Sequence, residues 1–191
     1  MKAKLILISV LVVVALAMVL PAGAGAKGAG SAYVYDAKLT QTNAAPVSGT
    51  CHFVTVKGRL IVQLHVMGLG DNMPHTAAIT GFTSGASAKL PTPAYDANKD
   101  GLISGAEAAV AVGAPLVWLQ PIAVKSNGRI IFHATLSHAD IMALDPINIM
   151  LGKCAVVVYG VMQQPTYYAL PFYDPTAPAA CGLIKAKWVV D

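Results

Sequence analysis

The chain has 191 residues, of which 55% are hydrophobic and 12% are charged, and it carries 13 basic against 9 acidic residues. The formal net charge of +4 is small and no basic stripe is interleaved with aromatic residues, so the composition argues against a nucleic-acid-binding protein. At this length we expect one domain with a substantial core.

The first segment has the pattern of a secretory signal. Lys2 and Lys4 precede an apolar run over residues 5–20, and Ala24 and Ala26 occupy the two small positions of a cleavage site. The run is shorter than the ~20 residues of a membrane-spanning helix. We therefore expect a signal peptide over 1–26 and a single domain over 27–191. The mature protein is expected to be secreted to the extracellular space or cell surface, without membrane association after cleavage.

After the signal, short alternating segments are separated by Gly, Pro and Asn, which predicts an all-β fold, a β-sandwich. The clearest strand spans 59–67, where Leu60, Val62, Leu64 and Val66 share one face and the intervening residues share the other. Further strands are expected at 33–39, 49–56, 76–82, 115–119, 155–161 and 181–190.

Other local patterns complete this outline. Asn127-Gly128 lies between two apolar runs and predicts a tight hairpin that pairs 119–124 with 129–135. His133 alternates with Ile131 and Thr135 on a strand and is expected to be half-buried and structural. Residues 167–180, rich in Pro and Tyr, are expected to form an extended loop.

The stretch Asp96-Ala-Asn-Lys-Asp-Gly-Leu-Ile-Ser-Gly-Ala-Glu107 matches a twelve-residue calcium loop. Ca²⁺ takes six to eight oxygen ligands, and the loop offers an oxygen at each position that needs one. Gly101 stands where the chain must turn sharply, and Ile103 is the apolar residue at the eighth position. The expected metal ligands are Asp96, Asn98, Asp100, the carbonyl of Leu102, Ser104 and Glu107.

The alternative is a surface turn rich in Asp and Asn, but such a turn requires neither Glu107 nor Ile103. Pro91 and Pro93 exclude a regular helix before the loop, and only the following residues, 104–111, predict a short helix. The pattern therefore indicates a calcium site within a long loop of a fold other than the helix-loop-helix hand.

Two further sets of side chains could form a disulfide or bind a metal ion. Cys51, Cys154 and Cys181 are disulfide candidates in an exported protein, and their odd number leaves one thiol or one inter-chain bridge. A second set could bind copper, because thioether and imidazole donors suit Cu(I): His65, Met67, Met73 and His75.

Four segments, in order, resemble the secreted CHRD-like proteins: residues 68–81, the Pro-Thr-Pro-Ala-Tyr segment with the calcium loop at 91–104, Val-Val-Val-Tyr-Gly at 156–160, and residues 173–184. The last of these also resembles the Ala-Cys-Gly run of copper/zinc superoxide dismutases. The resemblance implies a Greek-key β-sandwich, with the calcium loop as an insertion and a short helix after it.

Departures from the dismutase pattern bear on function. The positions that match the copper histidines are Ala78, Thr80 and Tyr159, and none of these can replace an imidazole. His75 matches a histidine that does not bind the metal in those enzymes. Relatives tend to have a cysteine where this chain has Leu90, so Cys181 must pair with Cys51 or Cys154, or stay reduced.

These patterns favour an exported, non-catalytic Ca²⁺-binding β-sandwich with a structural, self-association or adhesion role. Few charges are available to protect strand edges, which favours a homo-oligomer or a matrix or surface partner. The alternative is an extracytoplasmic copper-binding protein.

Overall fold

The computed structural model describes residues 32–43, 46–70, 73–123, 128–137, 139–141, 151–163 and 172–190, so the expected signal segment lies outside the described residues. The described chain is mostly strand, which confirms the predicted all-β class. Its elements are β1 (Ala32–Gln41), β2 (Ser48–Val56), β3 (Arg59–Met67), β4 (Pro74–Gly81), η1 (Pro93–Tyr95), α2 (Gly105–Val112), β5 (Ala114–Ala123), β6 (Ile130–Leu136), η3 (Leu151–Lys153), β7 (Ala155–Gln163) and β8 (Phe172–Val190).

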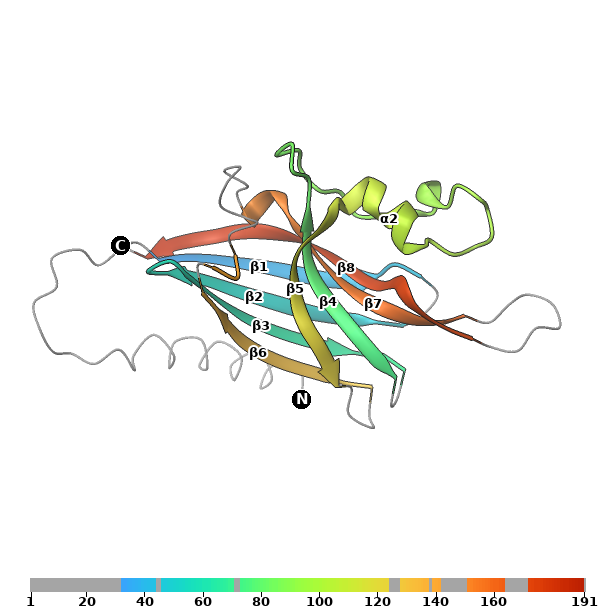
Figure 1. The fold of residues 1–191 in the computed structure, drawn as a ribbon, viewed down its shortest axis with the longest axis horizontal. Helices are drawn as coiled ribbons and strands as arrows, with labels where there is room; N and C mark the ends of the chain where they lie inside the picture. The colour runs from blue at the N-terminus through green and yellow to red at the C-terminus, as the bar shows by residue number, and fades with distance from the viewer. Residues whose placement is uncertain are drawn as a thin grey trace, which may run out of the picture.

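The strands form one curled antiparallel sheet with the order β5-β4-β7-β8-β1-β2-β3-β6. Strand β8 has 19 residues and joins the two halves, because its first part pairs with β7 and its second part pairs with β1. The connections from β3 to β4 and from β6 to β7 cross between the halves, as in a Greek key. In Figure 1, β4 and β5 pass in front of β1, β2 and β3, which gives the two layers of a sandwich.

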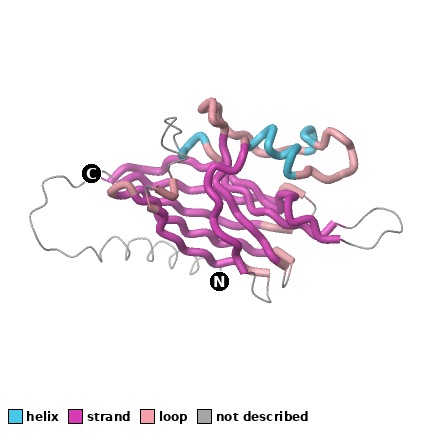
Figure 2. The backbone as a smooth tube through the Cα atoms, viewed as in Figure 1, coloured by secondary structure: helices cyan, strands magenta, loops and turns pink. Residues whose placement is uncertain are grey.

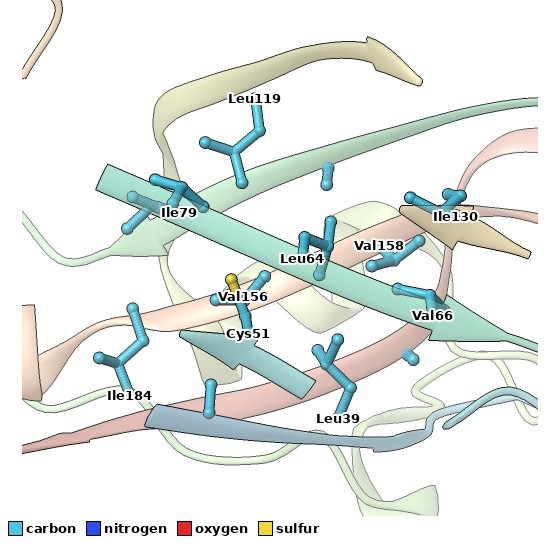
Figure 3. Close-up of a cluster of buried hydrophobic side chains, with 14 of the residues drawn as sticks. Leu39, Cys51, Leu64, Val66, Ile79, Leu119, Ile130, Val156, Val158 and Ile184 are labelled. Atoms are coloured by element: carbon cyan, nitrogen blue, oxygen red, sulfur yellow. The ribbon is translucent and has the colours of Figure 1, made fainter. Parts of the chain in front are cut away.

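The core lies between these layers. On β3 the predicted inward residues Leu60, Val62, Leu64 and Val66 are buried, whereas the residues between them are more exposed. Figure 3 shows apolar side chains from both halves filling this space, among them Leu39, Leu64, Ile79, Leu119, Val156 and Ile184. The period of two along each strand therefore builds one continuous core.

A second, smaller core lies on the outer face of β4, β7 and β8, where the insertion between β4 and β5 covers the sheet (Figure 2). Ala88, Ala111 and Val112 of the insertion pack with Ala78 and Val157 of the sheet. Small side chains on both sides allow close approach: a Cβ on Gly105, the first residue of α2, would lie 2.6 Å from the carbonyl oxygen of Thr176 in β8. The insertion is therefore packed onto the domain.

The predicted hairpin between 119–124 and 129–135 is wrong. Strand β5 pairs with β4, and β6 pairs with β3, at the other end of the strand order. Asn127 lies outside the described residues, and Gly128 has φ +63°. A turn sequence indicates where the chain reverses, but pairing depends on which sheet each apolar face can join.

The extended loop expected at 167–180 is also wrong in its described part, because 172–180 begins strand β8. Pro178 lies opposite Tyr159 at a register shift, where a proline costs no regular ladder hydrogen bond. No helix within the described ranges has the length and hydropathy needed to cross a membrane.

Candidate metal centre

The segment 96–107 starts after η1 and ends in the first turn of α2, so the predicted short helix is confirmed. Gly101 has φ +86° and nothing within 4 Å of the position of a Cβ, so its backbone conformation, and not lack of space, favours glycine there. Lys99 also lies in the left-handed region, with φ +59°. These two residues produce the tight turn in the first half of the loop.

Backbone N–H groups hold the carboxylate of Asp96 at the start of the loop. The N–H groups of Asp100 and Gly101 donate to its Oδ1 and Oδ2 at 3.2 and 2.9 Å. Asp100 in turn accepts from the N–H of Leu102 at 2.8 Å and from the side-chain amide of Asn98 at 2.8 Å. The first half of the loop is therefore wound around its own acidic side chains.

Glu107 closes the loop from the other end. Its Oε1 accepts from the N–H of Ala97 at 2.9 Å, ten residues earlier, and its Oε2 accepts from the N–H and hydroxyl of Ser104 at 2.8 and 2.9 Å. Ser104 is the N-cap of α2 and accepts from the N–H of Glu107, which completes a capping box. The Ser104 donors, with those of Ala97 and Asn98, hold the pKa of Glu107 below its ordinary value.

Asn43 anchors the loop to the sandwich, and the sequence did not single it out. Its side chain is buried, accepts from the N–H of Ile103 at 2.8 Å, and donates to the carbonyls of Ile103 at 3.0 Å and Pro178 at 2.8 Å. One amide thus offers Ile103 the donor and acceptor that a neighbouring strand would offer. In the sequence, Asn43 had only the features of a turn residue near a proline.

The donor set of the loop suits a hard cation, because carboxylate, amide, carbonyl and hydroxyl oxygens are the ligands of Ca²⁺. Within the described ranges, however, no three or more His, Cys, Asp or Glu side chains gather closely enough to hold a metal ion. The loop carboxylates accept hydrogen bonds from the loop itself. Binding of Ca²⁺ would therefore exchange some of these bonds, those of Glu107 above all, for contacts with the ion.

The second predicted metal set does not lie on one surface. His65 and Met67 are exposed on the outer face of β3, whereas His75 is buried, its Nδ1 3.1 Å from the carbonyl oxygen of Tyr159. Burial lowers the pKa of His75, although nearby carbonyls oppose this. The side chain of Met73 lies near Gly70, close to that of Met162.

Ala78, Thr80 and Tyr159, which the sequence resemblance was expected to place at copper-histidine positions, are enclosed within the fold. Ala78 and Tyr159 belong to the small core beneath the insertion, and the buried Thr80 donates to the carbonyl of Ala155 at 3.4 Å. Burial raises the pKa of Tyr159. The side chains at these positions pack or bond within the fold.

Cys51, Cys154 and Cys181 are buried, and no disulfide joins them within the described residues. Cys51 lies in the main core on β2, and Cys181 faces the small core on β8. Burial raises the pKa of Cys154 to about 11 and that of Cys181 to about 12.

Comparison with known proteins finds similarity among solved structures. No protein-family model matches the sequence, and no curated protein matches it. Among solved structures, that of the clock protein EA4 has a TM-score of 0.47 and 14% sequence identity, over 85% of this chain and 98% of that one.

Proposed function

We propose that this chain is an exported, non-catalytic β-sandwich protein whose loop 96–107 binds one Ca²⁺, and that it has a structural or adhesive role outside the cell. The loop supplies oxygen donors, the chemistry that Ca²⁺ prefers. The residues that would hold the ion are Asp96, Asn98, Asp100, the carbonyl of Leu102, Ser104 and Glu107. The expected signal peptide supports export, and the side chains of Ala78, Thr80 and Tyr159 argue against copper-dependent dismutase chemistry.

The observation that carries the proposal is the closure of the loop by Glu107, which reaches the N–H of Ala97 across ten residues. The same loop is joined to the sandwich through Asn43 and Ile103. An ion that binds the closed loop and not the unfolded chain stabilises the domain by linkage. Its structural role is then to hold the insertion against the outer face of β4, β7 and β8.

The expected size of this effect follows from the affinity of extracellular calcium modules, with Kd of roughly 10⁻⁴ to 10⁻³ M. At about 1 mM Ca²⁺ and a Kd near 10⁻⁴ M, linkage adds about 1.4 kcal/mol to the free energy of unfolding. For a domain of this length that corresponds to an increase of roughly 3–6 °C in Tm.

Thermal unfolding of the mature chain in millimolar Ca²⁺, in Mg²⁺ and in chelator tests the proposal. We expect Ca²⁺ to raise Tm and Asp96→Asn and Glu107→Gln to abolish the increase. The matched control is Asp140→Asn, because Asp140 accepts from the N–H and hydroxyl of Ser137 much as Glu107 accepts from Ser104 but lies outside the loop. An identical Tm for the wild-type protein in Ca²⁺ and in chelator would refute the calcium proposal.

We further propose that the protein acts by self-association or by contact with a matrix or surface partner. Several large apolar side chains are exposed, including Val110 on α2 at 69% and Trp118 on β5 at 54%. Light scattering over a range of concentrations, with and without Ca²⁺, measures this directly. A single monomeric species at every concentration, with and without Ca²⁺, would contradict self-association.

A further inference from the structure

Three histidines lie on the outer face of neighbouring strands, away from the calcium loop. His52 of β2 is opposite Gln63 of β3, and Gln63 is opposite His133 of β6. His65 follows Gln63 by two residues on the same face of β3 and is therefore diagonal to both histidines. The histidines are 13 to 81 positions apart in the sequence, and only the strand order brings them together.

His65 and His133 form the closest pair. Their ring centroids are 5.7 Å apart with an interplanar angle of 74°, and both side chains are exposed. His133 was expected to be half-buried and structural, but it faces solvent. His52 is engaged elsewhere, because its Nδ1 lies 2.6 Å from Asp36 Oδ1, and the other oxygen of Asp36 pairs with Lys187.

We propose that His65 and His133 form a binding site for a divalent transition-metal ion, with water completing the coordination. Metal–imidazole bonds of about 2.0 Å, at a tetrahedral angle, put two ring centroids about 5 Å apart. The observed 5.7 Å differs by less than 1 Å, a change within the freedom of exposed side chains. The two rings therefore lie near the separation that a shared ion requires.

The electrostatics of this surface favour the neutral imidazole that a metal requires. Partial burial lowers the pKa of His65, and electrostatic interaction with His133, His52 and Arg129 lowers it further. Among common divalent ions a site with nitrogen donors binds Cu²⁺ most strongly, in contrast to the oxygen donors of the loop 96–107.

The His65–His133 pair replaces the copper set expected from the sequence, because the buried His75 does not share a surface with His65. It also stands apart from the calcium proposal. Variants that lose Ca²⁺ binding at loop 96–107 would keep the histidine pair, and variants that lose the histidine pair would keep Ca²⁺ binding.

Calorimetric titration of the mature chain with Cu²⁺ and with Zn²⁺ at pH 7.4 tests the pair, with Tm measured in parallel. We expect one equivalent of Cu²⁺ to bind more tightly than Zn²⁺ and to raise Tm. Removing a residue that only hydrogen-bonds to a metal ligand costs roughly 10–100-fold in affinity, so His65→Ala and His133→Ala should each weaken binding by at least about tenfold.

The matched control is His52→Gln, on the same face of the sheet but paired with Asp36. We expect its metal affinity to stay within about twofold of the wild-type value. Because His65 and His133 are exposed, their alanine variants should keep the wild-type Tm without metal. Unchanged Cu²⁺ affinity in both alanine variants, or an equal loss in His52→Gln, would overturn the assignment.

Discussion

Substitution of Asn43 gives the sharpest test of how the insertion is attached to the sandwich. The buried amide makes three hydrogen bonds, two with the backbone of Ile103 and one with the carbonyl of Pro178. A typical intramolecular hydrogen bond contributes about 0.5–1.5 kcal/mol net, and a buried group left without a partner costs more. Asn43→Ala should therefore lower the free energy of unfolding by about 3 kcal/mol.

Urea unfolding followed by circular dichroism measures this loss, and for a domain of this length it corresponds to a decrease of roughly 6–12 °C in Tm. The loss should be present in chelator, because the three bonds involve no ion. It therefore tests the anchor independently of calcium. Gln41→Ala, at the exposed last residue of β1 and two positions before Asn43, should change stability by less than about 0.5 kcal/mol.

Asn43→Asp separates hydrogen bonding from packing. Aspartate has nearly the same shape and keeps an acceptor for the N–H of Ile103, but an ionised oxygen then faces the carbonyls of Ile103 and Pro178. We expect a loss at least as large as that of the alanine variant. If Asn43→Ala unfolds at the same urea concentration as Gln41→Ala, or Asn43→Asp matches the wild type, the anchor does not hold the insertion.

Two other predictions concern titration and sulfur. Burial opposes ionisation of Asp36, but Lys187 and His52 outweigh burial and hold the pKa of Asp36 below its ordinary value. The ionised carboxylate therefore contributes stability above about pH 4, and this stability is lost as pH falls through the lower pKa of the folded state. Asp36→Asn should reduce that part of the stability–pH curve by about 0.5–1 kcal/mol. An acid limb of the same size as in the wild type would contradict the pairing. The buried cysteines have raised pKa values and should resist alkylation at pH 8 until the chain unfolds. The Tm should be the same with and without reductant. Rapid labelling of the native protein, measured by mass spectrometry, would count against their burial.

Patterns confined to one segment predicted the local structure well. The alternation at Leu60, Val62, Leu64 and Val66 predicts both strand β3 and its buried face, because the period of two depends only on neighbouring residues. The spacing from Asp96 to Glu107 predicts the hydrogen-bonded loop and the helix after it, because both are formed by residues close together in the sequence. Calcium itself stays a prediction.

Such local patterns do not predict contacts between residues that are distant in the sequence. Asn43 lies 60 residues from Ile103 and 135 from Pro178, and His65 meets His133 only because β3 and β6 are neighbours. The hairpin predicted at Asn127-Gly128 failed for the same reason, since β5 and β6 join opposite ends of the strand order.

The sequence by itself determined the strand faces, the loop 96–107 and the short helix after it. Only the tertiary structure decided that a buried amide anchors the loop, that no disulfide joins the three cysteines within the described residues, and that two exposed histidines form a pair. The physical reason is that local periodicity fixes which way a side chain faces, whereas the strand order, set by burial of the whole core, fixes which distant side chain it meets.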